Sequence, residues 1–195
     1  MTKAKILIAY GTRSGSTKEI SEKLSEILEN NGFETDILDL KKQKNWPSID
    51  NYDGFMIGSG IRIGKWTKEV KKFLEKNKET LNALQKPLAL FVSCGDAANP
   101  DKQVEAKQKY LDNVIEEYGL VVALSDIFGG LFDLSETSNY NFMTKKIIKM
   151  ARNDMEKDFG VTFDEHGRND YRNWDRIAEF AIQFGDLIPK NVVNE

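Results

Sequence analysis

The chain has 195 residues, of which 40% are hydrophobic and 30% are charged, a composition typical of a soluble globular protein with one domain. Its 28 basic and 31 acidic side chains give a formal net charge of -3, which speaks against nucleic acid as a partner. A single cysteine, Cys94, excludes an internal disulfide and argues against a metal site, and no apolar run reaches the ~20 residues of a membrane span.

The first forty residues show a strand, a helix and a second strand. Ile6–Ala9 is a short apolar run that ends near Gly11, which indicates a strand buried on both faces. Because a strand pattern stands where a signal peptide would be, we expect a cytoplasmic protein. Apolar residues at helical spacing predict a helix over Ser16–Asn31, which Gly32 ends. Phe33–Leu40 alternates apolar and polar residues and predicts a strand near the sheet edge.

Three more strands and two more helices follow. Apolar runs predict strands at 52–59, 88–93 and 120–128. One helix between them has an apolar face made of Trp66, Val70, Phe73 and Leu74. The next helix, over 101–118, has an apolar face made of Val104, Leu111, Val114, Ile115 and Tyr118. Repeated strand–helix alternation predicts an α/β three-layer sandwich with a five-stranded parallel sheet in the order 2-1-3-4-5.

The C-terminal third is too long for one closing helix. We expect residues 1–195 to form a single domain in which 131–173 are an extension and 174–188 the closing helix. A helix is predicted over Phe142–Met155, with Met143, Ile147, Met150 and Ala151 on one face. Basic residues lie largely on its other face, and these are Lys145, Lys146, Lys149 and Arg152. They could contact an anionic membrane or partner, although a solvated helix face is the default interpretation. Residues 156–173 are polar and are predicted to form a loop.

The turn after the first strand carries an unusual number of hydroxyl groups. Its residues, hereafter the first loop, are Thr12, Arg13, Ser14, Gly15, Ser16 and Thr17. Backbone N–H groups and hydroxyls that meet at a helix N-terminus favour an anion, above all a phosphate. The sequence lacks both the G-x-G-x-x-G fingerprint and the Lys of a Walker loop. The alternative is an ordinary strand-to-helix turn with Ser16 as the N-cap residue.

Two further loops follow the third and fourth strands, and the predicted strand order brings all three loops to one crevice. The second loop, 58–64, includes Ser59, Gly60, Ile61, Arg62, Ile63 and Gly64. The third loop, 93–99, includes Ser93, Cys94, Gly95 and Asp96. Short glycine loops let backbone amides approach the polar edge of a flat ring such as an isoalloxazine. A glycine such as Gly60 or Gly64 could also let a backbone carbonyl turn toward that ring.

Several motifs resemble known flavoproteins. The segment Ser93-Cys94-Gly95-Asp96 resembles the Cys-Gly-Asp loop of small flavodoxins. Nearly the whole chain is similar to the flavodoxin-like protoporphyrinogen dehydrogenases, which are menaquinone-linked FMN proteins. The matching motifs are 10–17 (YGTRSGST), 52–54 (YDG), 57–64 (IGSGIRIG) and 173–175 (NWD). This resemblance implies that 12–17 bind the FMN phosphate and that 61–64 and 94–96 flank the ring. It also implies a quinone or a redox partner protein as the electron acceptor.

Some residues depart from these families or allow two interpretations. The third loop is small and acidic, where the dehydrogenases tend to have a longer basic loop. The second and third loops lack the stacking aromatics of electron carriers, and Trp66, the nearest candidate, also fits a core position. Asp96 could tune the cofactor or simply be a turn residue. Arg62 could meet a negative flavin edge or a substrate carboxylate, or remain a solvated loop residue. His166 is expected on the surface.

The sequence therefore favours an FMN-binding redox protein, an oxidoreductase resembling protoporphyrinogen dehydrogenase. The alternative is a non-enzymatic flavodoxin-type electron carrier, although a net charge of -3 is mild for the acidic docking surface of such carriers. A phosphate-responsive receiver domain would need clustered acidic residues after the first strand, and 10–12 (YGT) offers none. No residue is assigned a catalytic role from the sequence.

Overall fold

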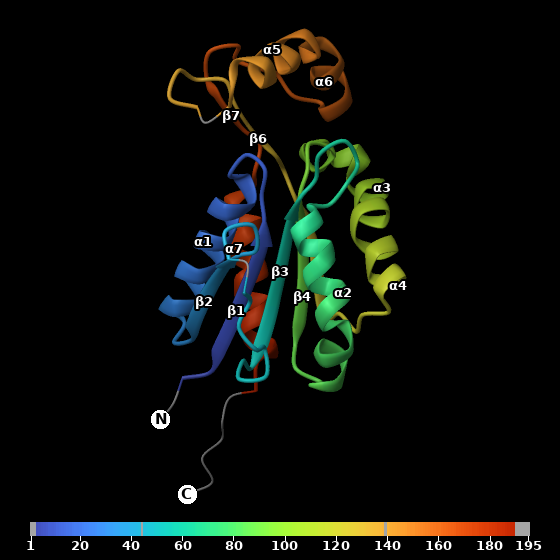
Figure 1. The fold of residues 1–195 in the computed structure, drawn as a ribbon. Coiled ribbons are helices and arrows are strands. Elements are labelled where there is room, and N and C mark those ends of the chain that lie inside the picture. Colours follow the sequence, from blue (N-terminus) through green and yellow to red (C-terminus); the bar gives the residue numbers. More distant parts are fainter. Residues whose placement is uncertain (1–2, 44, 139, 190–195) are drawn as a thin grey trace, which may run out of the picture.

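The computed structural model describes residues 3–43, 45–138 and 140–189. Its centre is a five-stranded parallel sheet with the order β2-β1-β3-β4-β5, which confirms the predicted topology (Figure 1). The strands are β1 (Lys5–Gly11), β2 (Glu34–Asp39), β3 (Gly54–Gly60), β4 (Leu88–Ser93) and β5 (Leu124–Phe128). Gly11 pairs with Ser59 and Gly60 pairs with Ser93, so β1, β3 and β4 end at nearly the same level. The three loops that follow them therefore start side by side.

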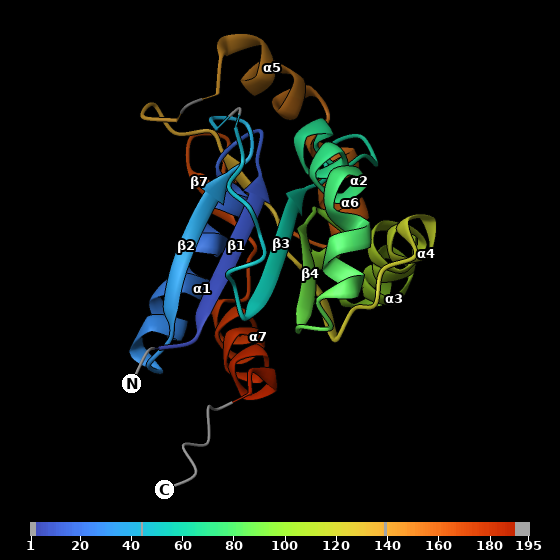
Figure 2. The same ribbon diagram turned by 60° about the horizontal axis from the view of Figure 1, so that its bottom comes forward.

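Helices cover both faces of the sheet, as Figures 1 and 2 show. The helices that pack on the sheet are α1 (Ser16–Asn30), α2 (Lys68–Ala83), α3 (Gln103–Lys107), α4 (Asn113–Tyr118) and α7 (Trp174–Leu187). Ile6 and Ile8 of β1 face α1 and α7, whereas Leu7 and Ala9 face the layer of α2, α3 and α4. This arrangement explains why the strands are apolar without alternation, because both faces of each central strand are buried.

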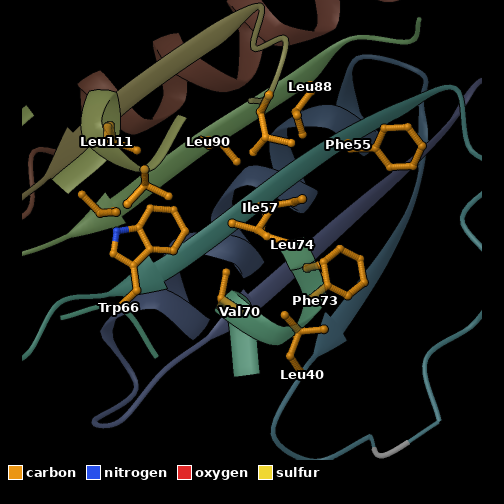
Figure 3. Close-up of a cluster of buried hydrophobic side chains, with 14 of the residues drawn as sticks. Leu40, Phe55, Ile57, Trp66, Val70, Phe73, Leu74, Leu88, Leu90 and Leu111 are labelled. Carbon is orange, nitrogen blue, oxygen red and sulfur yellow. The ribbon is translucent and has the colours of Figure 1, made fainter. Parts of the chain in front are cut away.

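Trp66 lies in the core on the α2 side of the sheet. It precedes α2 and packs near Val70 and Leu111 (Figure 3). Its indole Nε1–H donates a 2.7 Å hydrogen bond to the carbonyl oxygen of Tyr110. Of the two interpretations of this side chain, the structure therefore supports the core residue, with its polar atom satisfied as buried indoles require.

The helical segment predicted over 101–118 is present, but one residue assigned to its apolar face, Val104, does not face the core. It consists of a 3₁₀ turn (Pro100–Lys102), α3, a π-helical segment (Gln108–Asp112) and α4. The π segment has a wider turn, so the residues before it no longer share a face with those after it. Val104 is accordingly 84% exposed, whereas Leu111 and Val114 are buried.

The extension folds back over the carboxyl end of the sheet (Figures 1 and 2). It contains β6 (Leu131–Asp133), α5 (Phe142–Met150), α6 (Arg152–Phe159) and β7 (Arg168–Asp170), and β6 and β7 pair antiparallel. The single helix predicted over Phe142–Met155 is thus two helices that meet at Ala151. The loop predicted over 156–173 is also wrong, because it contains the end of α6 and β7. Within the described ranges, no helix is both long and apolar enough to cross a bilayer.

Candidate functional site

A cavity of about 420 Å³ lies between the ends of β1, β3 and β4 and the extension. This volume falls in the range of small-molecule and cofactor sites. Ten of the predicted site residues line it, namely Arg13, Ser14, Ser16, Gly60, Ile61, Arg62, Ile63, Ser93, Cys94 and Gly95. The structure thus brings all three loops to one cavity, as the strand order predicts. Six other predicted residues do not line it, namely Thr12, Gly15, Thr17, Ser59, Gly64 and Asp96.

The first loop has the geometry of an anion site at the start of a long helix. Gly15 has a φ of 99° and is the N-cap residue of α1, so the alternative with Ser16 as N-cap does not hold. The Gly15 N–H donates a 2.9 Å hydrogen bond to Thr12 Oγ1, which shapes the turn. The Ser16 hydroxyl instead accepts a 3.2 Å hydrogen bond from Ser93 Oγ, which joins the first and third loops.

Thr17 supplies a test of whether this loop fits a phosphate group. Its Oγ1 is buried and has no hydrogen-bond partner within the described part of the chain. An added Cβ on Gly60 would lie 3.1 Å from this oxygen, so the hydroxyl faces the end of β3. A buried hydroxyl without a partner is costly unless a ligand satisfies it. The residues present therefore fit a ligand that brings an acceptor to the N-terminus of α1.

Arg13 holds the first and second loops together. Its guanidinium donates to the carbonyl oxygens of Gly60 (3.2 Å), Lys65 (3.2 Å) and Trp66 (3.0 Å). Burial, and then the positive charge of Arg62, lower the pKa of Arg13 from its ordinary value. Because three backbone carbonyls use its donors, Arg13 fixes the position of the second loop.

The second loop ends in a tight two-residue turn. Arg62 and Lys65 exchange backbone hydrogen bonds of 3.1 and 3.2 Å around Ile63 and Gly64, which both have positive φ (50° and 67°). Such turns favour Asn or Gly at both central positions, so the β-branched Ile63 is strained. Its side chain is 88% exposed and stands at the cavity. Strain of this kind is often retained where a side chain serves a site.

The peptide between Gly60 and Ile61 has both of its polar groups bound. The Gly60 carbonyl accepts from Arg13, and the Ile61 N–H donates a 2.9 Å hydrogen bond to the Ser93 carbonyl. Turning the Gly60 carbonyl toward a ligand would therefore break both hydrogen bonds. The sequence-based expectation that this carbonyl could turn easily toward a flavin ring is thus not supported at Gly60. Gly64, at the tip of the turn, has open space around its Cα.

The third loop places Cys94 and Asp96 in different surroundings. Cys94 is buried, and burial raises the pKa of its thiol to about 12, so the group is a neutral thiol at physiological pH. Asp96 turns away from the cavity and accepts a 2.8 Å hydrogen bond from the Tyr110 hydroxyl. It lines a separate small hollow beside Lys102 and Lys109. Its carboxylate thus acts as a structural acceptor in this structure.

The extension forms the other wall of the cavity, which the sequence did not reveal. This wall contains Leu131, Phe132, Tyr140, Thr144, Ile147, Ile148, Met155 and Phe159. Phe159 lies against the third loop so closely that a Cβ on Gly95 would be 2.4 Å from its ring. Phe132 stacks on Phe159, with ring centroids 5.9 Å apart and an interplanar angle of 22°. The amphipathic pattern of 142–155 was the only signal, and of its predicted apolar face (Met143, Ile147, Met150 and Ala151) only Ile147 is among the residues that line the cavity.

Arg172 joins the extension to the start of α1. Its side chain is fully buried and donates to the Ser16 carbonyl (3.1 Å), to Glu19 (2.7 Å) and to Asp170 (2.7 and 2.6 Å). Its guanidinium carbon also lies 4.4 Å from the centre of the Trp174 ring. His166 lies in an exposed turn before β7 and does not line the cavity, as expected for a surface residue.

Comparison with known proteins identifies relatives of both sequence and fold. The Flavodoxin domain family matches residues 7–161. "Protoporphyrinogen IX dehydrogenase [quinone]" of Escherichia coli (strain K12) is 26% identical over 187 residues, which cover 95% of this chain and 97% of that protein. The protein of the same name from Leishmania major is 23% identical over 184 residues, 94% of this chain and 75% of the relative.

Solved flavodoxin structures have the same fold. Oxidised flavodoxin 1 from Bacillus cereus superposes with a TM-score of 0.56 at 16% identity, covering 95% of this chain and 100% of the other. A flavodoxin from the domain Archaea superposes with a TM-score of 0.52 at 15% identity, covering 94% and 98%. At these identities the likeness concerns the arrangement of the sheet and its helices.

Proposed function

The chain belongs to the Flavodoxin domain family, whose members imply a flavin cofactor, and we propose from this that it is an FMN-dependent oxidoreductase. Its reductant would be a porphyrinogen and its oxidant a quinone, as the names of the two dehydrogenase relatives suggest. The observation that carries this proposal is the apolar wall of the extension opposite the three loops. A cavity with an apolar wall of this kind suits a small molecule better than a docked carrier protein.

FMN fits the donor set of the cavity. The first loop, 12–17, would hold the phosphate through the N-terminus of α1 and the Thr17 hydroxyl, for which the described part of the chain offers no hydrogen-bond partner. Residues 61–64 and 94–96 would flank the ring with backbone amides at its polar edge, while the Asp96 carboxylate remains bonded to Tyr110 outside the cavity. When bound, FMN supplies the electron-accepting and electron-donating ring. Among the residues already placed, Thr12 and Gly15 would shape the first loop, and Ser59 would support the second.

The protein's own residues position the ligands and exclude water. Arg13 fixes the second loop through three carbonyl groups, so this wall of the cavity is rigid before a ligand binds. Ser59 Oγ accepts a 3.0 Å hydrogen bond from the Thr67 N–H, which anchors the segment that follows the loop. Phe159, Met155 and Ile148 cover the opposite side and keep solvent from the reacting groups.

The test is turnover with defined substrates under anaerobic conditions. We expect the FMN-loaded protein to oxidise protoporphyrinogen IX, with each pair of electrons and protons taken from the porphyrinogen reducing one quinone to its quinol. Protein stripped of FMN is the matched control. Porphyrin absorbance and quinone absorbance should change together. Firm binding of FMN without turnover, combined with fast electron exchange with a ferredoxin, would instead identify an electron carrier.

Contact with a membrane surface is a further part of the proposal, because quinones are apolar. Of the four basic residues that could make this contact, two have partners within the chain: Lys145 bonds to the Ser135 carbonyl, and Arg152 pairs with Glu156 and Glu165. Lys146 and Lys149 form no ion pair within the described residues. The exposed surface of α5 also includes Phe142, Met143 and Met150. Apolar residues flanked by lysines are typical of a helix that lies on an anionic bilayer.

A triple replacement of Phe142, Met143 and Met150 by serine tests this contact. We expect the variant to lose most of its co-sedimentation with vesicles of anionic lipid, because the helix would then bury little apolar area. Replacement of the exposed Val104, in α3, and Val121, between α4 and β5, should leave co-sedimentation unchanged. Equal co-sedimentation of wild type and triple variant would show that α5 does not bind the membrane.

A further inference from the structure

Resting on the function proposed above, we propose that Arg62 binds a carboxylate of the substrate at the cavity. Two arginines, Arg13 and Arg62, line the cavity, and their side chains differ in the hydrogen bonds that they form within the protein. The Arg13 guanidinium donates hydrogen bonds to three backbone carbonyl oxygens. The Arg62 side chain has no hydrogen bond or ion pair to any part of the chain that the structure describes.

The backbone holds Arg62 in a defined place. Its N–H and carbonyl pair with those of Lys65 across the tight turn, and Arg13 binds the Lys65 carbonyl from the other side. The neighbouring Ile61 and Ile63 also stand on the cavity wall. Because this turn already fixes the backbone of Arg62, the binding of a ligand by its guanidinium restricts only the side chain further.

The surroundings of Arg62 favour an anion. The charge of Arg62 lowers the pKa of Arg13, and the opposite effect of Glu69 is smaller. Both arginines line the cavity, whereas Glu69 is not among its lining residues. The rest of the wall is largely apolar, including Ile147, Met155 and Phe159. An apolar cavity with one unpaired cation selects an apolar molecule that carries an acidic substituent. Porphyrinogens with propionate side chains have this chemistry.

The FMN phosphate is a less suitable partner for this side chain. The phosphate would bind at the N-terminus of α1, where Thr17 Oγ1 has no hydrogen-bond partner among the described residues and the first turn of the helix presents backbone N–H groups. Arg62 comes from the second loop, beside the exposed Ile63, on the part of the wall assigned to the ring. A substrate that lies against the ring would bring its carboxylate to this position.

The experiment compares FMN-loaded wild type with Arg62→Gln and Lys65→Gln. Lys65 is the matched control, because it is the other exposed cation of the same turn and does not line the cavity. The probes are protoporphyrin IX, a stable relative of the substrate with two free propionates, and its dimethyl ester. Arg62→Gln should weaken binding of the acid about tenfold and leave the ester unchanged, since a charge-assisted hydrogen bond is lost. Lys65→Gln should alter neither.

The outcomes separate this inference from the proposed function. Equal binding of the acid to wild type and Arg62→Gln would overturn the inference alone. So would an equal loss of acid and ester, because Arg62 would then act through the shape of the loop. A selective loss of FMN relative to riboflavin would assign Arg62 to the cofactor phosphate and also overturn it. A wild type that binds FMN but neither porphyrin would overturn both proposals.

Discussion

Replacing Ser14 with glutamate is expected to weaken FMN binding by at least about 100-fold. Ser14 lies on the cavity wall in the first loop, beside the start of α1. A carboxylate there would stand near the phosphate, and two unit charges about 4 Å apart repel by roughly 4 kcal/mol at the effective dielectric of a protein surface. Because each 1.4 kcal/mol is a factor of ten, about 100-fold is a conservative expectation after screening.

Riboflavin makes this experiment specific, since it has the ring of FMN without the phosphate. Ser14→Glu should weaken FMN far more than riboflavin, and its effect should shrink as salt is added. Ser48→Glu, in an exposed loop between β2 and β3, introduces the same charge elsewhere and should change neither affinity. The measurement is quenching of flavin fluorescence on titration. Unchanged FMN affinity in Ser14→Glu would show that the phosphate binds away from the first loop.

The parts of the fold that sequence predicts well are those with a strong local signal. The apolar run Ile6–Ala9 is buried on both faces, and Leu88–Ser93 has the same bounds in prediction and structure. Such runs require a covered parallel sheet, and the rules for crossovers then leave few strand orders. The convergence of the three loops on one cavity follows from that order. The position of the first, second and third loops at the cavity therefore follows from local pattern and topology.

The parts that sequence misses depend on contacts between distant residues. Strands β6 and β7 have three residues each and pair Leu131 with Asp170, a separation that no local pattern encodes. The position of Phe159 over Gly95 depends in turn on this pairing and on the break between α5 and α6 at Ala151. Neither the stacking of Phe132 on Phe159 nor the contact of Phe159 with the third loop could be predicted from the sequence.

Replacing Arg172 with methionine is expected to lower the free energy of unfolding by about 3 kcal/mol. This value is at the low end for breaking a buried ion pair, because Glu19 and Asp170 keep some solvent contact. The substitution keeps an unbranched side chain but removes the bonds to Ser16, Glu19 and Asp170. Arg168→Met is the matched control, since Arg168 pairs with the same Glu19 from an exposed position. It should cost less than about 1 kcal/mol, as surface pairs do. Urea denaturation of both variants measures the difference.

The pH dependence of stability provides an independent check on Arg172. Burial alone would raise the pKa of Asp170, but the hydrogen bond and charge of Arg172 outweigh it and hold that pKa below its ordinary value. A carboxyl with a lowered pKa stabilises the fold above its unfolded pKa of about 4, and this stabilisation disappears as the pH falls through the folded pKa. The difference in free energy of unfolding between wild type and Arg172→Met should therefore shrink as the pH drops below about 4. A difference between the two proteins that stays constant from neutral to acid pH would mean that Arg172 stabilises the fold by packing on Trp174, and not through the carboxylates that join the extension to α1.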